Sequence, residues 1–339
     1  MRFGVIGCGT VSGYGHIPAL AEHPNISLVA LSDLNEDRLR ELGAKHGVTR
    51  LYTDYRELLN QEDIDAVTIA TPVSSHFEIA MAALAAGKHV FCEKPITNTV
   101  ESGWELVKAA EEAKLLLAVN FELRADTAHR MLKQALEAGE IGKVHFLRLV
   151  YNWSGPRWAG MERHRLLMTE GKGPIFDCGV HFFDLARWFS QSEYSQIMAS
   201  GVFVEGYPYP DHVVATCMLE NGALAVIDES WVFGHTVSSR ERYHINRIDI
   251  EGDNGTALLE HLPGGKLRLV VQSSKGVRQE EVGYQKAFAE MYSLFVASVA
   301  QGRLIDLAGG IDGVRAIEAA GAALNSVAEG GARQRIDSR

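Results

Sequence analysis

The first third of the chain alternates short apolar runs with segments of helical spacing. The apolar runs lie at 3–7, 26–33, 50–53, 66–72, 89–94 and 115–120. Helical patterns separate them near 11–22, 35–47, 55–60, 75–86 and 99–113. Continuous apolar runs between helices are typical of parallel strands that are buried on both faces. The pattern predicts a doubly wound α/β domain over residues 1–121.

The pattern changes after a helix expected at 124–138. Apolar and polar positions then alternate in runs at 144–153, 213–220, 223–233, 247–252 and 266–273. Alternation indicates half-buried strands, and the turns at 220–222 and 263–265 suit a mostly antiparallel sheet. Two helical segments follow, near 285–301 and 310–328. We therefore expect a second, α+β domain over residues 122–339.

Composition narrows the range of partners. The 339 residues are 46% hydrophobic and 22% charged, with a formal net charge of -10, which disfavours nucleic acid and anionic lipid. No apolar run reaches membrane-spanning length, and the first residues do not resemble an export signal. The four cysteines form no CxxC pair, which suits a reducing compartment and argues against structural zinc. We expect a cytoplasmic protein with small-molecule partners, no membrane or nucleic-acid partner and no metal.

A glycine-rich turn follows the first predicted strand. Gly7, Gly9 and Ser12 form a G-x-G-x-x-S variant, in which glycines let the backbone approach a pyrophosphate at the start of a helix. Asp33 ends the second strand, where a carboxylate accepts hydrogen bonds from the ribose and repels a 2′-phosphate. NAD is thus favoured, although nearby Arg38 keeps NADP open. The cofactor contacts expected here are Gly7, Cys8, Gly9, Thr10, Val11, Ser12, Asp33, Leu34 and Arg38.

Further candidates lie at the carboxyl ends of the later strands, where such folds bind ligands. Lys94 ends an apolar strand and precedes a proline that fixes the chain direction, so its ammonium should face the crevice. The alternative is a Glu93–Lys94 pair on a solvated rim. His76 either reaches the edge of the cofactor or caps local backbone. Thr71, Pro72, His76, Glu93, Lys94 and Asn120 complete the expected cofactor-binding set.

The segment 173–189 is apolar on almost every face but is interrupted by Asp177, His181 and Asp184. In a single helix these three side chains share one stripe. An Asp and a His four residues apart either satisfy each other inside a core or belong to a site. Asp184 and Arg187, three residues apart, suit a structural ion pair.

Four motifs together resemble the Gfo/Idh/MocA oxidoreductases, a family that includes glucose-fructose oxidoreductase and inositol dehydrogenases. They are GCGTVS at 7–12, ATPVSSH at 70–76, EKP at 93–95 and DCGVH at 177–181, a D-x-G-x-H pattern. The resemblance spans nearly the whole chain. It implies that Lys94 is the catalytic lysine, that Asp177 and His181 complete the site, and that an open sheet in the second domain builds homodimers or homotetramers. Ser12 replaces the usual third glycine or alanine, a small change that leaves cofactor binding intact.

The resemblance implies hydride transfer between nicotinamide and a secondary hydroxyl or ketone of a sugar, polyol or cyclitol. His181 suits proton exchange near neutral pH, with Asp177 fixing its tautomer. Lys94 either stabilises the developing alkoxide or takes the proton itself, and the sequence does not choose between His181 and Lys94. Arg157, Trp158 and Tyr151 are candidate substrate contacts. The substrate and the direction of the reaction stay open.

Two other classes of protein compete with this interpretation. One is a non-catalytic sensor of NAD(P) and a ligand with the same fold, which the joint presence of Lys94, Asp177 and His181 disfavours. The other is a metal-dependent enzyme using His181, Asp177 and His76, which is disfavoured because these positions form no compact ligand set on one element.

Overall fold

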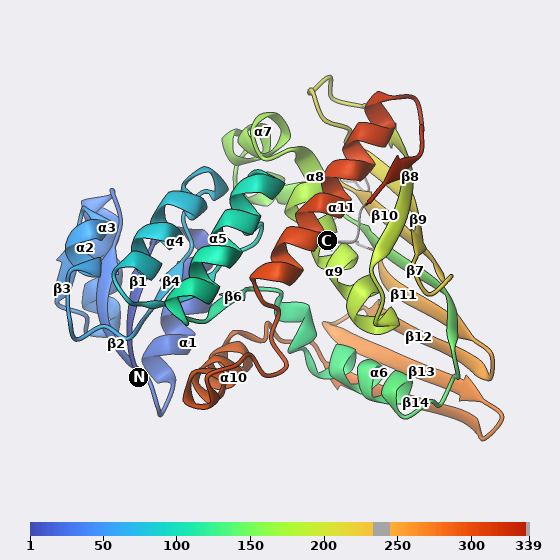
Figure 1. The fold of residues 1–339 in the computed structure, drawn as a ribbon, viewed down its shortest axis with the longest axis horizontal. Helices are drawn as coiled ribbons and strands as arrows, with labels where there is room; N and C mark the ends of the chain where they lie inside the picture. The colour runs from blue at the N-terminus through green and yellow to red at the C-terminus, as the bar shows by residue number, and fades with distance from the viewer. Residues whose placement is uncertain (233–244, 337–339) are drawn as a thin grey trace. The chain divides into compact units, whose positions relative to one another are not determined.

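The chain divides into two compact units. The computed structural model describes residues 1–232 and 245–336, apart from the side chains of residues 158 and 159. The first unit contains Met1–Ala125 and Lys286–Ile317, and the second contains Asp126–Gln285 and Glu318–Arg339 (Figure 1). The sequence analysis assigned residues 286–317 to the second domain, whereas they fold with the first unit.

A six-stranded parallel sheet forms the centre of the first unit. Its strand order is β3-β2-β1-β4-β5-β6, the doubly wound arrangement expected from the alternating pattern. The order reverses direction between β1 and β4, which is where such sheets bind ligands. The strands are β1 (Arg2–Ile6), β2 (Ser27–Ser32), β3 (Arg50–Tyr52), β4 (Ala66–Ile69), β5 (His89–Cys92) and β6 (Leu117–Val119).

Helices connect these strands near the predicted positions. They are α1 (Ile17–Glu22), α2 (Glu36–His46), α3 (Tyr55–Leu59), α4 (His76–Ala85) and α5 (Val100–Ala113), with short 3-10 turns at Val73–Ser75 and Glu122–Arg124. The side chains of Asn35, Asp54 and Thr99 accept backbone N–H groups and so begin α2, α3 and α5. The helix expected at 11–22 begins instead as a π-helical turn over Ser12–His16.

The return of the C-terminal segment has a physical cause in the pattern of α10 (Phe288–Gln301). Phe288, Met291, Tyr292 and Phe295 recur at helical spacing and are buried. The ring centroid of Tyr292 lies 5.6 Å from that of Phe3 and 4.9 Å from that of Phe91. These rings join β1, β5, α1 and α10 in one core, so the apolar stripe of α10 completes the first unit.

A nine-stranded, mostly antiparallel sheet forms the second unit, as predicted. Its order is β14-β13-β12-β11-β7-β10-β9-β8-β15, and among the described pairs only β7 and β10 run parallel. β8, β12, β14 and β15 were not predicted from the sequence. The strands are β7 (Val144–Asn152), β8 (Tyr194–Val202), β9 (His212–Leu219), β10 (Leu224–Ser230), β11 (Ile245–Gly252), β12 (Gly255–Leu262), β13 (Lys266–Ser273), β14 (Gly276–Gly283) and β15 (Gln334–Arg335).

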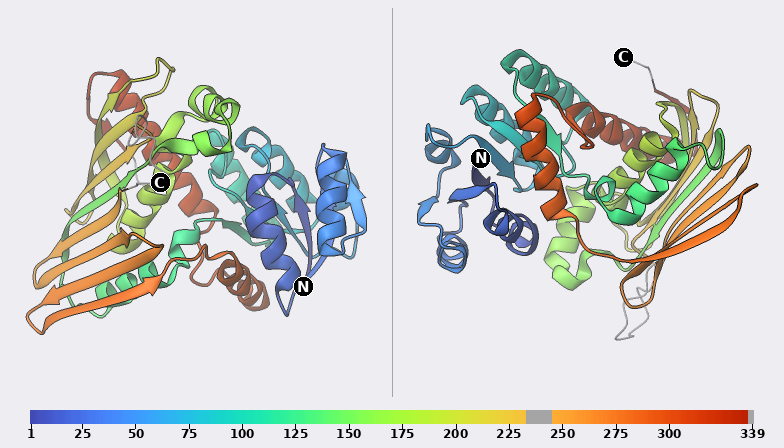
Figure 2. Two further views of the ribbon diagram at one scale, coloured as in Figure 1. Left: turned by 180° about the vertical axis from the view of Figure 1, so that it is seen from behind. Right: turned by 90° about the horizontal axis from the view of Figure 1, so that it is seen from below.

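Helices pack on one face of this second sheet (Figure 2). α6 (Thr127–Glu137) contacts β12 and β13, while α8 (Gly173–Asp177) and α9 (Gly179–Ser190) contact β10. The end of α11 (Gly310–Ala328) joins them through Ser326, whose hydroxyl accepts a hydrogen bond from the Ala199 N–H of β8. Alternating burial along β9 leaves every second side chain exposed, so its other face is open within the described residues.

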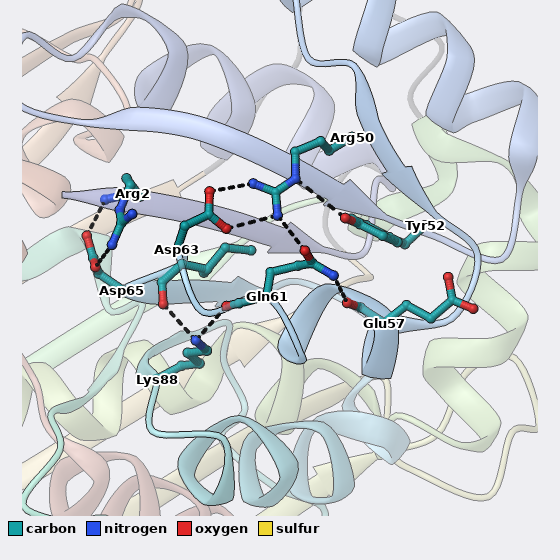
Figure 3. A network of polar contacts seen from close by, with 9 residues as sticks. Arg2, Arg50, Tyr52, Glu57, Gln61, Asp63, Asp65 and Lys88 are labelled. Atoms are coloured by element: carbon teal, nitrogen blue, oxygen red, sulfur yellow. Dashed lines mark hydrogen bonds and ion pairs between the residues drawn. The ribbon is translucent and has the colours of Figure 1, made fainter.

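A network of polar contacts holds the loop between α3 and β4 in the first unit (Figure 3). Arg50 forms a bidentate ion pair with Asp63, at 2.7 and 3.0 Å, and Arg2 pairs with Asp65 at 2.9 Å. The buried Lys88 Nζ donates to the carbonyl oxygens of Gln61 and Ile64, at 2.8 and 2.9 Å. The ammonium of Lys88 therefore satisfies the Ile64 carbonyl oxygen and adds a shorter hydrogen bond to that of Gln61, which also accepts the Ile64 N–H at 3.4 Å.

We expect Lys88→Met to destabilise the first unit by about 1–3 kcal/mol, because it removes both donors from buried carbonyl oxygens. Denaturant unfolding followed by circular dichroism measures the change. The exposed Lys108, paired only with Glu112 at 3.7 Å on α5, supplies the control, and Lys108→Met should cost less than about 0.5 kcal/mol. Equal losses in the two variants would contradict a specific role for the Lys88 hydrogen bonds.

Candidate active site

A pocket of about 290 Å³ lies at the carboxyl edge of the parallel sheet in the first unit. At Gly7, φ is +95° and a Cβ atom would lie 2.6 Å from the backbone of Ala70, so only glycine fits. A Cβ at Gly9 would meet no atom within 4 Å, so open space lies beside the loop. Of the predicted cofactor contacts, the pocket is lined by Gly7, Gly9, Asp33, Leu34, Thr71 and Pro72.

Asp33 lies at the end of β2 and is bound to the glycine loop. Its Oδ2 accepts the Cys8 N–H at 2.6 Å, and its Oδ1 accepts the Asn35 N–H at 2.8 Å. Arg38 Nε donates to the Cys8 carbonyl oxygen at 3.0 Å. Burial raises the pKa of the Cys8 thiol to about 12, with the Asp33 charge adding to it, so the thiol is neutral and Cys8 contributes backbone groups.

These residues fit a dinucleotide cofactor. Each Asp33 oxygen accepts one backbone hydrogen bond and has a second lone pair for a ribose hydroxyl. Leu34, next in sequence, is 92% exposed and offers an apolar surface beside the pocket. The Oδ1 atom of Asn120 is buried and has no hydrogen-bond partner among the described residues, as expected of an acceptor whose donor belongs to a ligand.

His76 bonds to local backbone, one of the two alternatives that the sequence left open. The side chain is buried, with Nδ1 2.9 Å from the Pro95 carbonyl oxygen and Nε2 2.9 Å from that of Thr71. Burial lowers the pKa of His76, and the two carbonyl oxygens only partly oppose this effect. A neutral imidazole carries a single N–H, so His76 donates to one of these carbonyl oxygens, and its ring lies between the loop after β4 and the turn after β5, which contains Lys94.

Glu93 is buried, so it does not lie on a solvated rim with Lys94. Its Oε1 accepts hydrogen bonds from His16 Nε2 and Asn120 Nδ2, both at 2.7 Å, and its Oε2 accepts the Lys94 N–H at 3.2 Å. Burial alone would raise the pKa of Glu93, but the His16 hydrogen bond and the charges of His16 and Lys94 outweigh burial and lower it. Lys94 is half-buried beside a carboxylate that stays ionised at neutral pH.

The segment 173–189 is two helices, which corrects the expectation of one. α8 ends at Asp177 and α9 begins at Gly179, with Cys178 between them. Gly179 packs so closely against α8 that a Cβ there would lie 2.9 Å from Ile175 Cδ1, so the break keeps the two helices together. His181 is buried on the first turn of α9, and Asp177 is half-buried at the end of α8. The interrupted stripe still presents both motif residues at the α8–α9 junction.

The Asp184–Arg187 pair exists at 3.9 Å, as its spacing predicts. The shorter contacts of the Arg187 guanidinium go to Glu193, at 2.6 and 2.7 Å. Both members of the predicted pair are buried, which identifies them as structural residues of the second unit.

The candidate substrate residues differ in how many contacts their side chains already make within the second unit. Arg157, in the 3-10 turn Gly155–Ala159, donates to the Ser154 and Trp231 carbonyl oxygens and pairs with Glu205 at 2.6 Å. Its guanidinium thus joins segments of the second unit. Tyr151 stacks on Phe182 with centroids 5.5 Å apart, and the side chain of Trp158 lies outside the described residues. The α7 helix (Met161–Thr169) follows that turn.

Two residues near the Lys94 turn were not predicted from the sequence: His16, which contacts Glu93, and Tyr292, which contacts His16. His16 is buried and also contacts the Tyr292 hydroxyl through Nδ1, at 2.7 Å. The sequence did contain a signal for His16, because it lies one helical turn after Ser12, close behind the glycine loop. The sequence contains no such signal for Tyr292, because nothing in its local sequence places α10 in the first unit.

Within residues 1–232 and 245–336, no three His, Cys, Asp or Glu side chains gather as a metal-ligand set. In the same part of the chain, every helix is too short or too polar to cross a lipid bilayer.

Comparisons with known proteins agree with this architecture. Residues 1–121 match an oxidoreductase family with an NAD-binding Rossmann fold, and residues 129–258 match the GFO/IDH/MocA C-terminal domain. The myo-inositol 2-dehydrogenase of Thermotoga maritima is 30% identical over 316 residues, which cover 89% of each chain. The 1,5-anhydro-D-fructose reductase of Ensifer adhaerens is 30% identical over 235 residues, covering 68% of this chain and 69% of the relative.

A solved structure shares the fold. The crystal structure of an oxidoreductase from Agrobacterium radiobacter, in complex with NAD+, L-tartaric acid and magnesium, matches with a TM-score of 0.88 at 23% identity, over 99% of this chain and 98% of that one. With both domain families and a 30% identical relative matched along most of its length, the chain belongs to the Gfo/Idh/MocA family of NAD-binding oxidoreductases.

Proposed function

We propose that this protein is an NAD-dependent dehydrogenase or reductase that acts on a secondary hydroxyl or ketone of a cyclitol, sugar or polyol. The observation on which the proposal rests is the position of Lys94. It follows β5 at the carboxyl edge of the sheet whose pocket contains Gly7, Gly9 and Asp33, and it lies next to an ionised carboxylate. Relatives named for inositol and anhydrofructose chemistry support this class of substrate.

The first unit holds the cofactor. Backbone N–H groups of residues 9–12 would hold the pyrophosphate, since those of Gly7 and Cys8 already donate to Ser32 and Asp33. Asp33 would accept the hydrogen bonds of the adenosine ribose. Asn120 Oδ1 and the loop at Thr71-Pro72 would contact the nicotinamide part of the cofactor. When bound, NAD supplies the hydride acceptor of the oxidation, or as NADH the donor of the reduction.

The protein's own side chains handle the proton. Lys94 Nζ donates a hydrogen bond to the reacting oxygen of the substrate, and the charge of the neighbouring Glu93 carboxylate favours its ammonium form. A ring nitrogen of His181 accepts the hydroxyl proton in the oxidation and returns it in the reduction. Asp177 orients the His181 ring and stabilises its protonated form.

Substrate selection belongs to the second unit in this proposal. Tyr151 offers an aromatic face for an apolar side of the substrate, and Trp158 is proposed to stack on a sugar or nicotinamide ring. Arg157 acts chiefly by holding the loop in place, since its guanidinium is used in contacts to Ser154, Trp231 and Glu205.

The open face of the second sheet is proposed to pair with a second copy of the chain. Met198, Val214 and Met218 lie on β8 and β9 and are 42%, 37% and 40% exposed. Exposed apolar side chains gathered on a flat sheet are typical of subunit interfaces. We also propose a cytoplasmic location, where the four cysteines, all free in the structure, stay reduced.

The substrate class is tested by following nicotinamide reduction with inositols, aldoses and sugar acids, and NADH oxidation with keto-sugars, each with the NADP form in parallel. We expect turnover with at least one cyclitol or sugar, and kcat/KM for NAD about tenfold or more above that for NADP, because Asp33 repels a 2′-phosphate. Asp33→Ser should reduce this preference, and Asp37→Asn, at a 94% exposed side chain on α2, should not. Tight NAD binding without turnover on the whole panel would favour the sensing protein instead.

Lys94→Met and His181→Asn should each lower kcat by a factor of about 100 or more, because each removes a group that acts on the transferred proton or the charge it leaves. The Kd for NAD, measured by calorimetry, should change by less than about threefold, since neither residue binds the pyrophosphate or the adenosine ribose. Lys108→Met is the control for loss of a lysine. Near-normal turnover in Lys94→Met would remove Lys94 from the mechanism.

Light scattering tests the subunit interface. We expect the native chain to have the mass of a dimer or tetramer of the 37.2 kDa protomer. The double variant Val214→Lys, Met218→Lys should shift it toward the monomer, because it puts like charges opposite each other in a symmetric interface. Leu166→Lys, at a 38% exposed residue of α7, is the control. A monomeric native chain would refute this part of the proposal.

A further inference from the structure

A chain of buried hydrogen bonds begins at Glu93 and runs away from the pocket. Glu93 Oε1 contacts His16 Nε2 at 2.7 Å, and His16 Nδ1 contacts the Tyr292 hydroxyl at 2.7 Å. The Tyr292 hydroxyl contacts Thr68 Oγ1 at 2.8 Å. His16, Tyr292 and Thr68 are fully buried. The chain joins four elements of the first unit, namely the π-helical turn, β4, the end of β5 and α10.

The chemistry of the groups fixes the hydrogen bond at Glu93. An ionised carboxylate only accepts, so His16 Nε2 carries a proton and donates to Glu93. The Tyr292 hydroxyl, which contacts both His16 Nδ1 and Thr68 Oγ1, keeps its own proton because burial raises the pKa of Tyr292 well above its usual range.

Packing of the core alone does not require this network of polar groups around Glu93. Burying a carboxylate is costly, and an apolar side chain of similar size at position 93 would pack without His16, Asn120 or the Tyr292 hydroxyl. The carboxylate instead lies one residue from Lys94, and it accepts the Lys94 N–H. A fixed negative charge at this place acts on the ammonium group of Lys94.

The other titratable groups near this pair come from several elements. Glu122 of the 3-10 turn after β6 is within electrostatic range of Glu93, and it pairs with Lys286, which precedes α10. Tyr14, in the π-helical turn, interacts with Glu93 and Lys94, and His76 of α4 interacts with both. Glu122 pairs with Lys286, whereas Glu93 is adjacent to Lys94 in the sequence and interacts electrostatically with it.

We propose that His16 is a positioning residue of the active site: oriented by Tyr292, it holds the Glu93 carboxylate ionised and in place, and Glu93 in turn keeps the Lys94 ammonium protonated and aimed at the substrate oxygen. The consequence for catalysis rests on the proposed role of Lys94. The effect of His16 on the pH at which Lys94 loses its proton does not rest on that role, and it can be measured without substrate.

The sign of the effect follows from the network. Without His16, the buried Glu93 loses one of its two side-chain donors, so its pKa rises and its carboxylate is no longer held in place beside Lys94. A displaced Glu93 carboxylate stabilises the ammonium less, so Lys94 loses its proton at lower pH. In the wild type the opposite holds, and Lys94 stays protonated further into the alkaline range.

The test is competitive acetylation of the full-length apoprotein with trace acetic anhydride across pH 6–11, with Lys94 modification quantified by peptide mass spectrometry. The midpoint of reactivity reports deprotonation of Lys94. We expect His16→Leu to lower this midpoint by about one unit, Tyr292→Phe to lower it less, and His16→Gln, whose amide can still donate to Glu93, to restore most of it. In a Glu93→Gln background, His16→Leu should have no further effect.

His89→Leu supplies the matched control. His89 begins β5, at the opposite end of the strand from Glu93, and its Nδ1 accepts the Leu116 N–H at 3.0 Å. The variant therefore removes a histidine and a hydrogen bond from the same strand, and it should leave the Lys94 midpoint unchanged. Circular dichroism and the Kd for NAD establish that each variant is folded; should His16→Leu fail to fold, Tyr292→Phe and His16→Gln still give the comparison.

The outcomes separate the two proposals. A Lys94 midpoint that is the same in the wild type, His16→Leu and Tyr292→Phe would overturn the role of His16, whatever the activity of the enzyme. Normal turnover of Lys94→Met would overturn the proposed function and leave the labelling result standing. If both proposals hold, the alkaline fall of kcat in His16→Leu should move to lower pH together with the Lys94 midpoint, and kcat should fall about 10–100-fold.

Discussion

The ionised carboxylate of Glu93, buried at the end of β5, is the constraint on which the site in the first unit depends. A charge at that depth persists only when donors surround it, and here His16, Asn120 and the Lys94 N–H supply them. Each donor comes from a different part of the unit, namely the glycine-loop turn, the end of β6 and the turn after β5 itself. Satisfying one carboxylate therefore positions the glycine loop, Asn120 and Lys94 against one another.

The hydrogen bonds around Glu93 also involve the segment of the chain that returns to the first unit after the second unit. His16 needs a partner on its other ring nitrogen, and Tyr292 of α10 provides it while its ring packs on Phe3 and Phe91. Glu122–Lys286 and Arg124–Asp312, the latter at 3.0 Å, add ion pairs between the end of the nucleotide-binding segment and the returning one. Apolar packing supplies most of the stabilisation, and the polar chain fixes the register of α10 on the sheet.

In the second unit, the motif residues are positioned by helix packing instead of a buried charge. These residues lie at a junction between two short helices, where close packing of Gly179 on Ile175 sets the angle at which Asp177 and His181 are presented. Around them, Arg157 and His164 share the carboxylate of Glu205, at 2.6 and 2.9 Å, so the preceding loop has an internal ionic core of its own. Rigid support of this kind is what a substrate-binding element requires if a proton is to move over a short, fixed distance.

The sequence alone determined the alternation of parallel strands and helices and the glycine loop, and it predicts Asp33 as the residue that selects the cofactor and Lys94, Asp177 and His181 as catalytic residues. These features depend on local patterns such as apolar runs, glycine spacing and short motifs, which can be recognised in the sequence without knowledge of the fold. Only the tertiary structure decided the helix break at Cys178 and the contacts of the His76 ring with two carbonyl oxygens. It also decided the burial of Glu93 and the hydrogen bond between His16 and Tyr292, which are 276 residues apart. No local pattern encodes these, because each results from competition among distant groups for the same buried space and the same hydrogen bonds.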